Sequence, residues 1–142
     1  VQCGGIGWGV DDLVRRASAM PSVKLRGYVP DSELGSLYRG ALAAAFPSIY
    51  EGFHLPPLDA VGVGCPVIAS DIPVHREVLG DAAVFVAPQD ARAWAAAIKS
   101  LRDDSARRAQ LAEAGRRRAL GFTWEASARA LLRLFQCVAR DY

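Results

Sequence analysis

Two acidic residues, Glu51 and Asp59, stand eight positions apart in a segment whose other residues suit phosphate binding. A glycine-containing loop follows Glu51, and Pro56 and Pro57 then open a short helix, because proline has no N–H to lose in a first turn. Backbone N–H groups at such a loop and helix start bind phosphate oxygens. The residues expected to offer them are Gly52, Phe53, His54 and Leu55.

The two acids are expected to bind hydroxyl groups, because a carboxylate placed among phosphate oxygens would repel them. Glu51 would then face neutral hydroxyls. Asp59, expected in the first turn of the helix, would accept hydrogen bonds from a vicinal diol, as acidic residues do from ribose in dinucleotide-binding folds. Phosphate between two hydroxyl-binding carboxylates describes a nucleotide-sugar.

Residues 51–60 resemble the E-x7-E signature of retaining glycosyltransferases of the GT-B fold, family 4, also called group 1. The resemblance is mannosyltransferase-like and covers nearly the whole chain, in order and at plausible spacing. Further matching segments are residues 27–30 with Leu34 and Tyr38, residues 47–50, residues 64–70, residues 77–78 followed by residues 80–83, and residues 122–125. The chain departs from the family at two positions. Asp59 replaces the usual Glu, and His54 replaces a Gly at which the backbone approaches the donor.

The resemblance implies the donor-binding C-terminal domain of a retaining hexosyltransferase, with Glu51 as the catalytic residue that holds sugar hydroxyls at the reacting centre. Residues 52–55 would contact the donor sugar and its phosphates, and Asp59 would hold the ribose. Tyr28 and Val29 would border the nucleotide base. The resemblance implies no cofactor and no metal, because amides and basic side chains can stabilise a leaving diphosphate.

The expected donor is a nucleotide-diphosphate-sugar, with GDP-mannose as the first candidate, in polysaccharide or glycolipid synthesis. An N-terminal domain outside this sequence would bind the carbohydrate or lipid-linked acceptor. The Arg and Lys that usually hold the diphosphate would also come from an upstream segment. Two alternatives stay open: a non-catalytic nucleotide-sugar-binding module of the same fold, and a GT-B sugar-nucleotide epimerase.

The composition of the 142 residues fits a single globular domain. A net charge of +2 is too small to indicate nucleic-acid binding. Cys3, Cys65 and Cys137 form no C-x-x-C pair and are expected to be free, buried thiols. The absence of a bilayer-length apolar run or signal peptide gives a cytosolic location as the default, with peripheral membrane contact as an option.

Alternating strand and helix patterns predict an α/β class: a Rossmann-like parallel sheet with helices on both faces. Strands are expected near residues 1–3, 23–26, 42–46, 67–69 and 84–86, and helices near residues 11–19, 31–38, 56–62, 72–78, 90–101, 105–120 and 123–138. The start of the chain looks like the tail of a strand, so we expect a domain truncated at its N-terminal side. In a sheet of order 3-2-1-4-5-6 the central strand would then be missing. We expect one of three outcomes: the chain closes that gap, its strand at residues 1–3 pairs directly with the strand at residues 42–46, or it pairs with a strand of another copy.

Three features have both a functional and a structural interpretation. Residues 4–9 form either a phosphate-cradling loop or, as we favour, a tight turn in which Trp8 packs. The arginines of residues 107–118 are interpreted as a solvated helix face rather than a membrane patch. His75 and Glu77 point to different helix faces at i and i+2, so they are not expected to act as an acid–base pair, although the family resemblance keeps Glu77 as a minor candidate.

Overall fold

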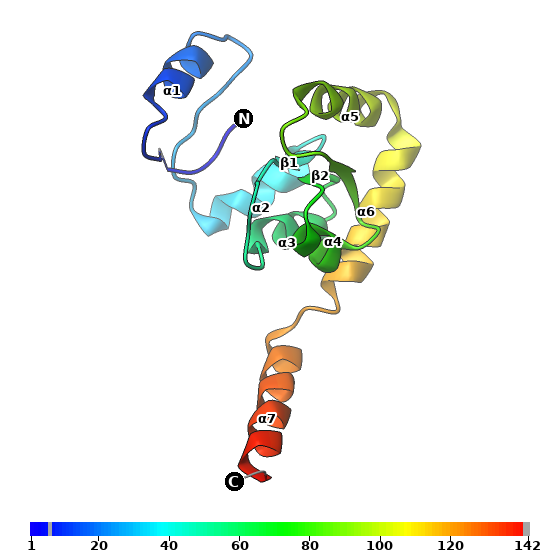
Figure 1. Cartoon of the computed structure of the whole chain (residues 1–142). Coiled ribbons are helices and arrows are strands. Elements are labelled where there is room, and N and C mark those ends of the chain that lie inside the picture. Colours follow the sequence, from blue (N-terminus) through cyan, green and yellow to red (C-terminus); the bar gives the residue numbers. More distant parts are fainter. Residues whose placement is uncertain (6, 141–142) are drawn as a thin grey trace. The chain divides into compact units, whose positions relative to one another are not determined.

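The structure is a computed structural model that describes residues 1–5 and 7–140, the last of them by its backbone alone. Two compact units divide the chain, Val1–Leu37 and Tyr38–Tyr142. The helices in Figure 1 are α1 (Asp11–Ser18), α2 (Asp31–Gly40), α3 (Leu55–Gly62), α4 (Pro73–Leu79), α5 (Ala91–Asp103), α6 (Ser105–Ala119) and α7 (Trp124–Arg140). The strands are β1 (Ala44–Phe46), β2 (Val67–Ser70) and β3 (Ala83–Val86).

The second unit is built on a three-stranded parallel sheet in the order β1-β2-β3. Ala45 pairs with Ile68 of β2, and Ile68 pairs with Val84 of β3. Parallel strands require crossover connections, and α3 and α4 supply them between successive strands. The predicted α/β class with a parallel sheet is therefore confirmed.

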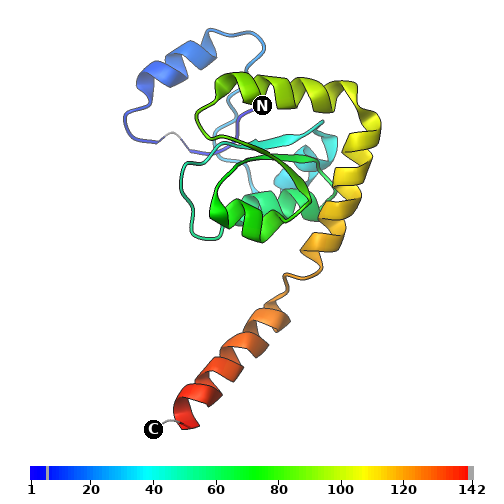
Figure 2. The same cartoon turned by 45° about the vertical axis from the view of Figure 1, so that its right-hand side comes forward.

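The central strand β2 divides the core into two halves, because successive side chains of a strand point to opposite faces. Val67 and Ala69 pack with residues of α3 and α4, whereas Ile68 packs with Leu101 of α5 and Leu111 of α6. Figures 1 and 2 show α5 on one side of the strands, with α3 and α4 on the other. All four residues of β2 are buried, as the apolar sequence predicts for a strand covered on both faces.

β1 differs from that prediction. Its three residues are half-buried or exposed, and it pairs with β2 alone within the described sheet. An edge strand has one neighbour rather than two, so a continuous apolar run does not guarantee two covered faces.

The first unit contains one parallel β-bridge, between Gln2 and Leu25. The Gln2 amide donates to Lys24 O at 2.8 Å, and the Arg26 amide donates to Gln2 O at 2.9 Å. The predicted strands at residues 1–3 and 23–26 are thus reduced to a bridge in the part of the chain that the structure describes. In the described residues, the recorded strand pairings are this bridge and the three-stranded sheet of the second unit.

Several helix starts follow from local side chains. The Asp90 carboxylate accepts from the Ala93 amide at 3.0 Å, and Thr123 Oγ1 accepts from the Ala126 amide at 3.1 Å, as the sequence predicts for N-cap residues. Prolines occupy the first turns of α3 and α4. These elements begin within one or two residues of their predicted starts.

Burial is less well predicted. Trp8 is fully exposed rather than packed, and Ile98 of α5 is exposed although its neighbour Leu101 is buried. Ile6 of the glycine-rich segment lies outside the described residues. The apolar side chains of α7 are exposed: Leu131, Leu132, Leu134, Phe135 and Val138.

Of the thiols, only Cys65 is buried, whereas Cys3 and Cys137 are exposed. Among the helices described, none has the length and apolarity needed to span a membrane.

The arginines of α6 are only partly the solvated face that the sequence predicts. Arg117 pairs with Glu113 at 3.1 Å on the surface. By contrast, Arg108 Nη1 donates to Arg102 O at 2.9 Å, and Arg118 Nε donates to Val78 O at 2.9 Å. These guanidinium groups occupy carbonyls at the ends of α5 and α4, a stabilising role for a cation at a helix C-terminus.

Candidate functional site

Glu51 lies in the loop between β1 and α3, at the carboxyl end of the parallel sheet, where ligands bind in open α/β folds. Its side chain is 31% exposed. Ser48 Oγ donates to Glu51 Oε1 at 2.8 Å, and His54 Nε2 lies 3.5 Å from the same oxygen. Both recorded contacts involve Oε1, so in the part of the chain described here Oε2 is left to accept hydrogen bonds from a ligand.

The residues between Glu51 and α3 are accessible. Gly52, Phe53 and Leu55 are exposed, and His54 is half-buried. Of the four amide groups that an α-helix leaves without internal partners at its start, Pro56 and Pro57 remove two. The amides of His54 and Leu55 are the remaining ones, so anion binding at this helix depends on the loop side of its N-terminus.

Asp59 lies on the same helix but not where the sequence predicts. Because α3 begins at Leu55, its first turn contains no acidic residue, and Asp59 follows in the second turn. Its side chain is exposed. A carboxylate one turn further along lies beyond the amides of the helix start, which keeps it away from phosphate and consistent with a hydroxyl partner.

His54 turns its side chain into the protein. Its backbone adopts a left-handed conformation (φ 67°, ψ 77°), and its side chain is only 13% exposed. The imidazole packs edge-on against Phe46 at 5.5 Å and stacks on His75 at 5.1 Å between ring centroids. The side chain that stands where the family usually has Gly therefore fills a space beneath the loop.

His75 of α4 contacts His54 from the interior of the protein. It is fully buried, its Nε2 lies 2.8 Å from His54 Nδ1, and its Nδ1 lies 2.9 Å from Ser70 O. Glu77 is exposed and contributes its backbone carbonyl to Arg118. The prediction that His75 and Glu77 face different ways is confirmed, but the contact of His75 with His54, 21 residues away, is not visible in the sequence.

The electrostatics of His54 are set by burial and by two neighbours. Burial lowers the pKa of His54 below its usual 6.5, the Glu51 carboxylate raises it, and His75 lowers it further. Because burial is the largest cause, the pKa of the imidazole stays below 6.5 despite the adjacent carboxylate.

A second support of the loop comes from the end of α6. The Phe53 ring meets Phe122 edge-on at 5.7 Å, and the Arg118 guanidinium lies 5.0 Å from the Phe122 ring centroid. Ser48 and Phe122 therefore both hold the loop of residues 51–54. Both residues lie in segments that resemble the family, but their types and spacing alone predict no role for either.

Tyr28 and Val29, the residues expected near the nucleotide base, lie in the first unit. Tyr28 is 80% exposed and Val29 is buried. They follow Gly27, whose positive φ of 64° turns the chain after the bridge at Leu25. An exposed aromatic ring beside a tight turn is suited to stacking on a planar base.

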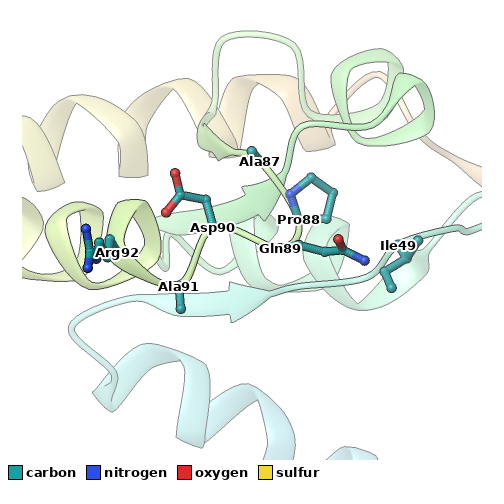
Figure 3. A pocket seen from close by; sticks show the side chains of 7 residues that line it. All are labelled: Ile49, Ala87, Pro88, Gln89, Asp90, Ala91 and Arg92. Carbon is teal, nitrogen blue, oxygen red and sulfur yellow. The ribbon is translucent and has the colours of Figure 1, made fainter.

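A hollow of about 700 Å³ also lies at the carboxyl edge of the sheet, beside the loop that carries Glu51. Figure 3 shows Ile49 on one side and residues 87–92 on the other, which comprise the connection from β3 and the first two residues of α5. The Asp90 carboxylate there is engaged in capping α5. The hollow is open and does not include Glu51 or His54, so we take the contacts around Glu51 as the centre of the site.

A sequence profile of the family described as Glycosyl transferases group 1 matches residues 10–118. The chain belongs to this family. O-antigen chain mannosyltransferase B of Escherichia coli is 42% identical over 123 residues, which cover 84% of this chain and 32% of that protein. A D-inositol 3-phosphate glycosyltransferase of Kineococcus radiotolerans is 35% identical, covering 92% of this chain and 32% of its own length.

Solved structures agree with the sequence relatives. Sucrose-phosphate synthase from Thermosynechococcus elongatus has a TM-score of 0.81 and 30% identity, covering 94% of this chain and 34% of that one. TarM, at a TM-score of 0.78 and 19% identity, shares the fold. The predicted resemblance to GT-B group 1 glycosyltransferases of mannosyltransferase type is confirmed. The chain spans about a third of the length of these relatives.

Proposed function

We propose that residues 1–142 form the donor-binding C-terminal domain of a retaining glycosyltransferase that uses a nucleotide-diphosphate-sugar. The observation that carries the proposal is the arrangement of Glu51. One of its oxygens is held by Ser48, and the carboxylate lies directly before an open loop and helix start. A carboxylate that accepts hydroxyls next to amides that bind phosphate matches the two halves of a sugar diphosphate.

In this proposal the amides of residues 52–55 contact the phosphates and the sugar. As the bond between sugar and diphosphate breaks, negative charge develops on the leaving oxygen, and preorganised amides stabilise that charge. Glu51 holds the sugar hydroxyls, so that the anomeric carbon is presented to the acceptor in one orientation. Asp59 holds the ribose, and Tyr28 and Val29 border the base.

The proposed donor is GDP-mannose, for which the names of the relatives provide support. Two of the curated proteins similar to this chain are O-antigen chain mannosyltransferases, from Escherichia coli and Salmonella typhimurium. The acceptor is proposed to be a carbohydrate or a lipid-linked carbohydrate, bound mainly by an N-terminal domain outside these 142 residues. A cytosolic site of action with peripheral membrane contact remains part of the proposal.

The test uses the intact protein that carries this chain. Calorimetry with GDP-, UDP- and TDP-linked sugars identifies the donor, and turnover is followed with Glu51→Gln and with Glu113→Gln. Glu51→Gln is expected to lower activity about 10- to 100-fold, the effect of losing one charge-assisted hydrogen bond. Glu113 is an exposed carboxylate on α6, so Glu113→Gln serves as the matched control and retains activity.

Three outcomes contradict the proposal in different ways. Donor binding without transfer to any acceptor indicates a non-catalytic module. Conversion of the donor to its epimer without an acceptor indicates an epimerase. An inverted anomeric configuration in the product, read by NMR coupling constants, contradicts the retaining mechanism.

A further inference from the structure

A continuous series of polar contacts leads from the interior of the protein to Glu51. Ser70 O, at the end of β2, lies 2.9 Å from His75 Nδ1. His75 Nε2 lies 2.8 Å from His54 Nδ1, and His54 Nε2 lies 3.5 Å from Glu51 Oε1. The two histidines therefore use both ring nitrogens, and the proton on each nitrogen is determined by what it faces.

The inner end of the series fixes the first proton. A carbonyl oxygen only accepts hydrogen bonds, so His75 Nδ1 must carry a hydrogen. A neutral imidazole whose hydrogen is on Nδ1 carries none on Nε2. His75 Nε2 is then an acceptor, and His54 Nδ1 must be the donor across the 2.8 Å contact.

The second proton follows from the first. A neutral His54 whose Nδ1 carries the hydrogen has an unprotonated Nε2. That nitrogen faces Glu51 Oε1, itself an acceptor, and the separation of 3.5 Å is longer than an ordinary N–H···O hydrogen bond of about 2.9 Å. The contact has the geometry of two acceptors lying side by side.

We propose that His75 is a positioning residue that holds His54 in the Nδ1–H tautomer, which keeps a proton off the nitrogen facing Glu51 and leaves the carboxylate available to hydroxyls of the donor sugar. This inference rests on the proposed function of Glu51. It assigns a purpose to the side chains of both histidines.

At low pH the contact between His54 Nε2 and Glu51 Oε1 changes from two acceptors to a donor and an acceptor. When Nε2 of His54 gains a proton, it donates to Glu51 Oε1 and forms an ion pair that competes with the donor. The charged or titratable groups recorded against His54 in the described residues are Glu51 from its own loop and His75 from α4, and Phe46 of β1 supplies only an aromatic edge. Burial lowers the pKa of His54, so this competition begins below pH 6.5.

Two substitutions of His75 separate positioning from packing. In His75→Asn the shorter side chain still reaches Ser70 O but no longer offers an acceptor to His54. His54 then becomes free to carry its proton on Nε2 and to donate to Glu51 without any charge. In His75→Gln the amide oxygen stands close to the original Nε2 position and accepts from His54 Nδ1, so the wild-type tautomer is retained.

The first measurement needs no donor. Long-range proton–nitrogen NMR correlations on the intact protein distinguish the two tautomers, and signals are assigned by their loss in His54→Gly and His75→Asn. We expect Nδ1–H on both histidines of the wild type and on His54 of His75→Gln, and Nε2–H on His54 in His75→Asn. An Nε2–H form of His54 in the wild type, or no change in His75→Asn, overturns the inference.

The second measurement follows the donor KM with pH. In the wild type the KM rises below pH 6.5, by at most about tenfold per pH unit for one ionisation. His75→Asn raises the KM already at neutral pH and removes the pH dependence, whereas His75→Gln behaves as the wild type. Equal KM profiles for the wild type and His75→Asn contradict the inference.

If circular dichroism shows that both His75 variants fold poorly, the test uses His54→Gly instead. His54→Gly is compatible with the left-handed backbone at this position and removes the competing donor, so the acid rise in KM is lost. An acid rise that persists in His54→Gly overturns the inference. If no nucleotide-sugar binds at all while the tautomers are as stated, the proposed function fails and the assignment of protons stands.

Discussion

Gly115 of α6 lies against Val61 of α3 so closely that a Cβ at Gly115 would stand 2.7 Å from the Val61 Cβ and 3.0 Å from its carbonyl oxygen. Both residues are buried. The absence of a side chain at this one position lets the two helices approach, and α6 thereby fixes the helix whose N-terminus carries the donor loop (Figure 1).

Gly115→Ala is expected to destabilise the protein by about 1–3 kcal/mol, the usual effect of overpacking a core. The expectation is opposite in sign to the ordinary gain of about 0.5–1 kcal/mol when a helical glycine becomes alanine. Gly40→Ala provides the matched control, since nothing lies within 4 Å of a Cβ at Gly40. Urea unfolding measures both changes, and a stabilised Gly115→Ala variant contradicts the close approach.

Arg118→Met is expected to lower the free energy of unfolding by about 1.5–3 kcal/mol, because the guanidinium bonds to carbonyls of Glu77 and Val78 at the end of α4. Arg117→Met is the control. Arg117 is one residue away, and its recorded side-chain partner among the described residues is Glu113, an exposed i,i+4 pair that contributes about 0.3–0.5 kcal/mol. Similar losses in both variants would show that the carbonyl contacts of Arg118 are not stabilising.

The stability of the wild type is expected to fall in mild acid because of His54. Its pKa is lower in the folded protein than the 6.5 of an ordinary histidine, so between these values the unfolded chain binds more protons than the folded one. Stability is therefore highest above pH 6.5 and decreases as the pH falls through the folded-state pKa.

Unfolding of the wild type and of His54→Gly at a series of pH values isolates this contribution. The wild type is expected to lose free energy of unfolding relative to the variant as the pH falls. A constant difference between the two proteins shows that burial does not lower the pKa of His54.

The three thiols are expected to differ in reactivity. Cys65 is buried and burial raises its pKa, so it should remain unmodified by a thiol reagent in the folded protein. Cys3 is exposed and should react at once. Mass spectrometry of peptides labelled before and after denaturation distinguishes the two, and rapid native labelling of Cys65 would contradict its burial.

Residues that act on the backbone next to them in the chain were predictable from the sequence. Pro56, Pro57, Asp90 and Thr123 each set a helix start by a local mechanism that needs no partner elsewhere in the chain. The same holds for the buried strand β2, whose continuous apolar run is typical of a central parallel strand.

Features that depend on distant partners were not predictable. An apolar stripe shows that a helix face suits a partner but not whether one covers it, so the exposed side chains of α7 escaped prediction. His54 and His75 lie 21 residues apart and meet only because β1 and β2 pair side by side. Asp59 falls in the second turn because α3 begins one residue before its prolines.

The contact between His54 and His75 also bears on how this loop can be redesigned. A library that varies position 54 alone removes the hydrogen-bond partner of the fully buried His75 Nε2. Each member without a donor at position 54 is expected to lose about 1–3 kcal/mol of stability. Members of such a library would lose stability for a reason unrelated to substrate choice. Positions 54 and 75 should be randomised together, so that selection acts on catalysis.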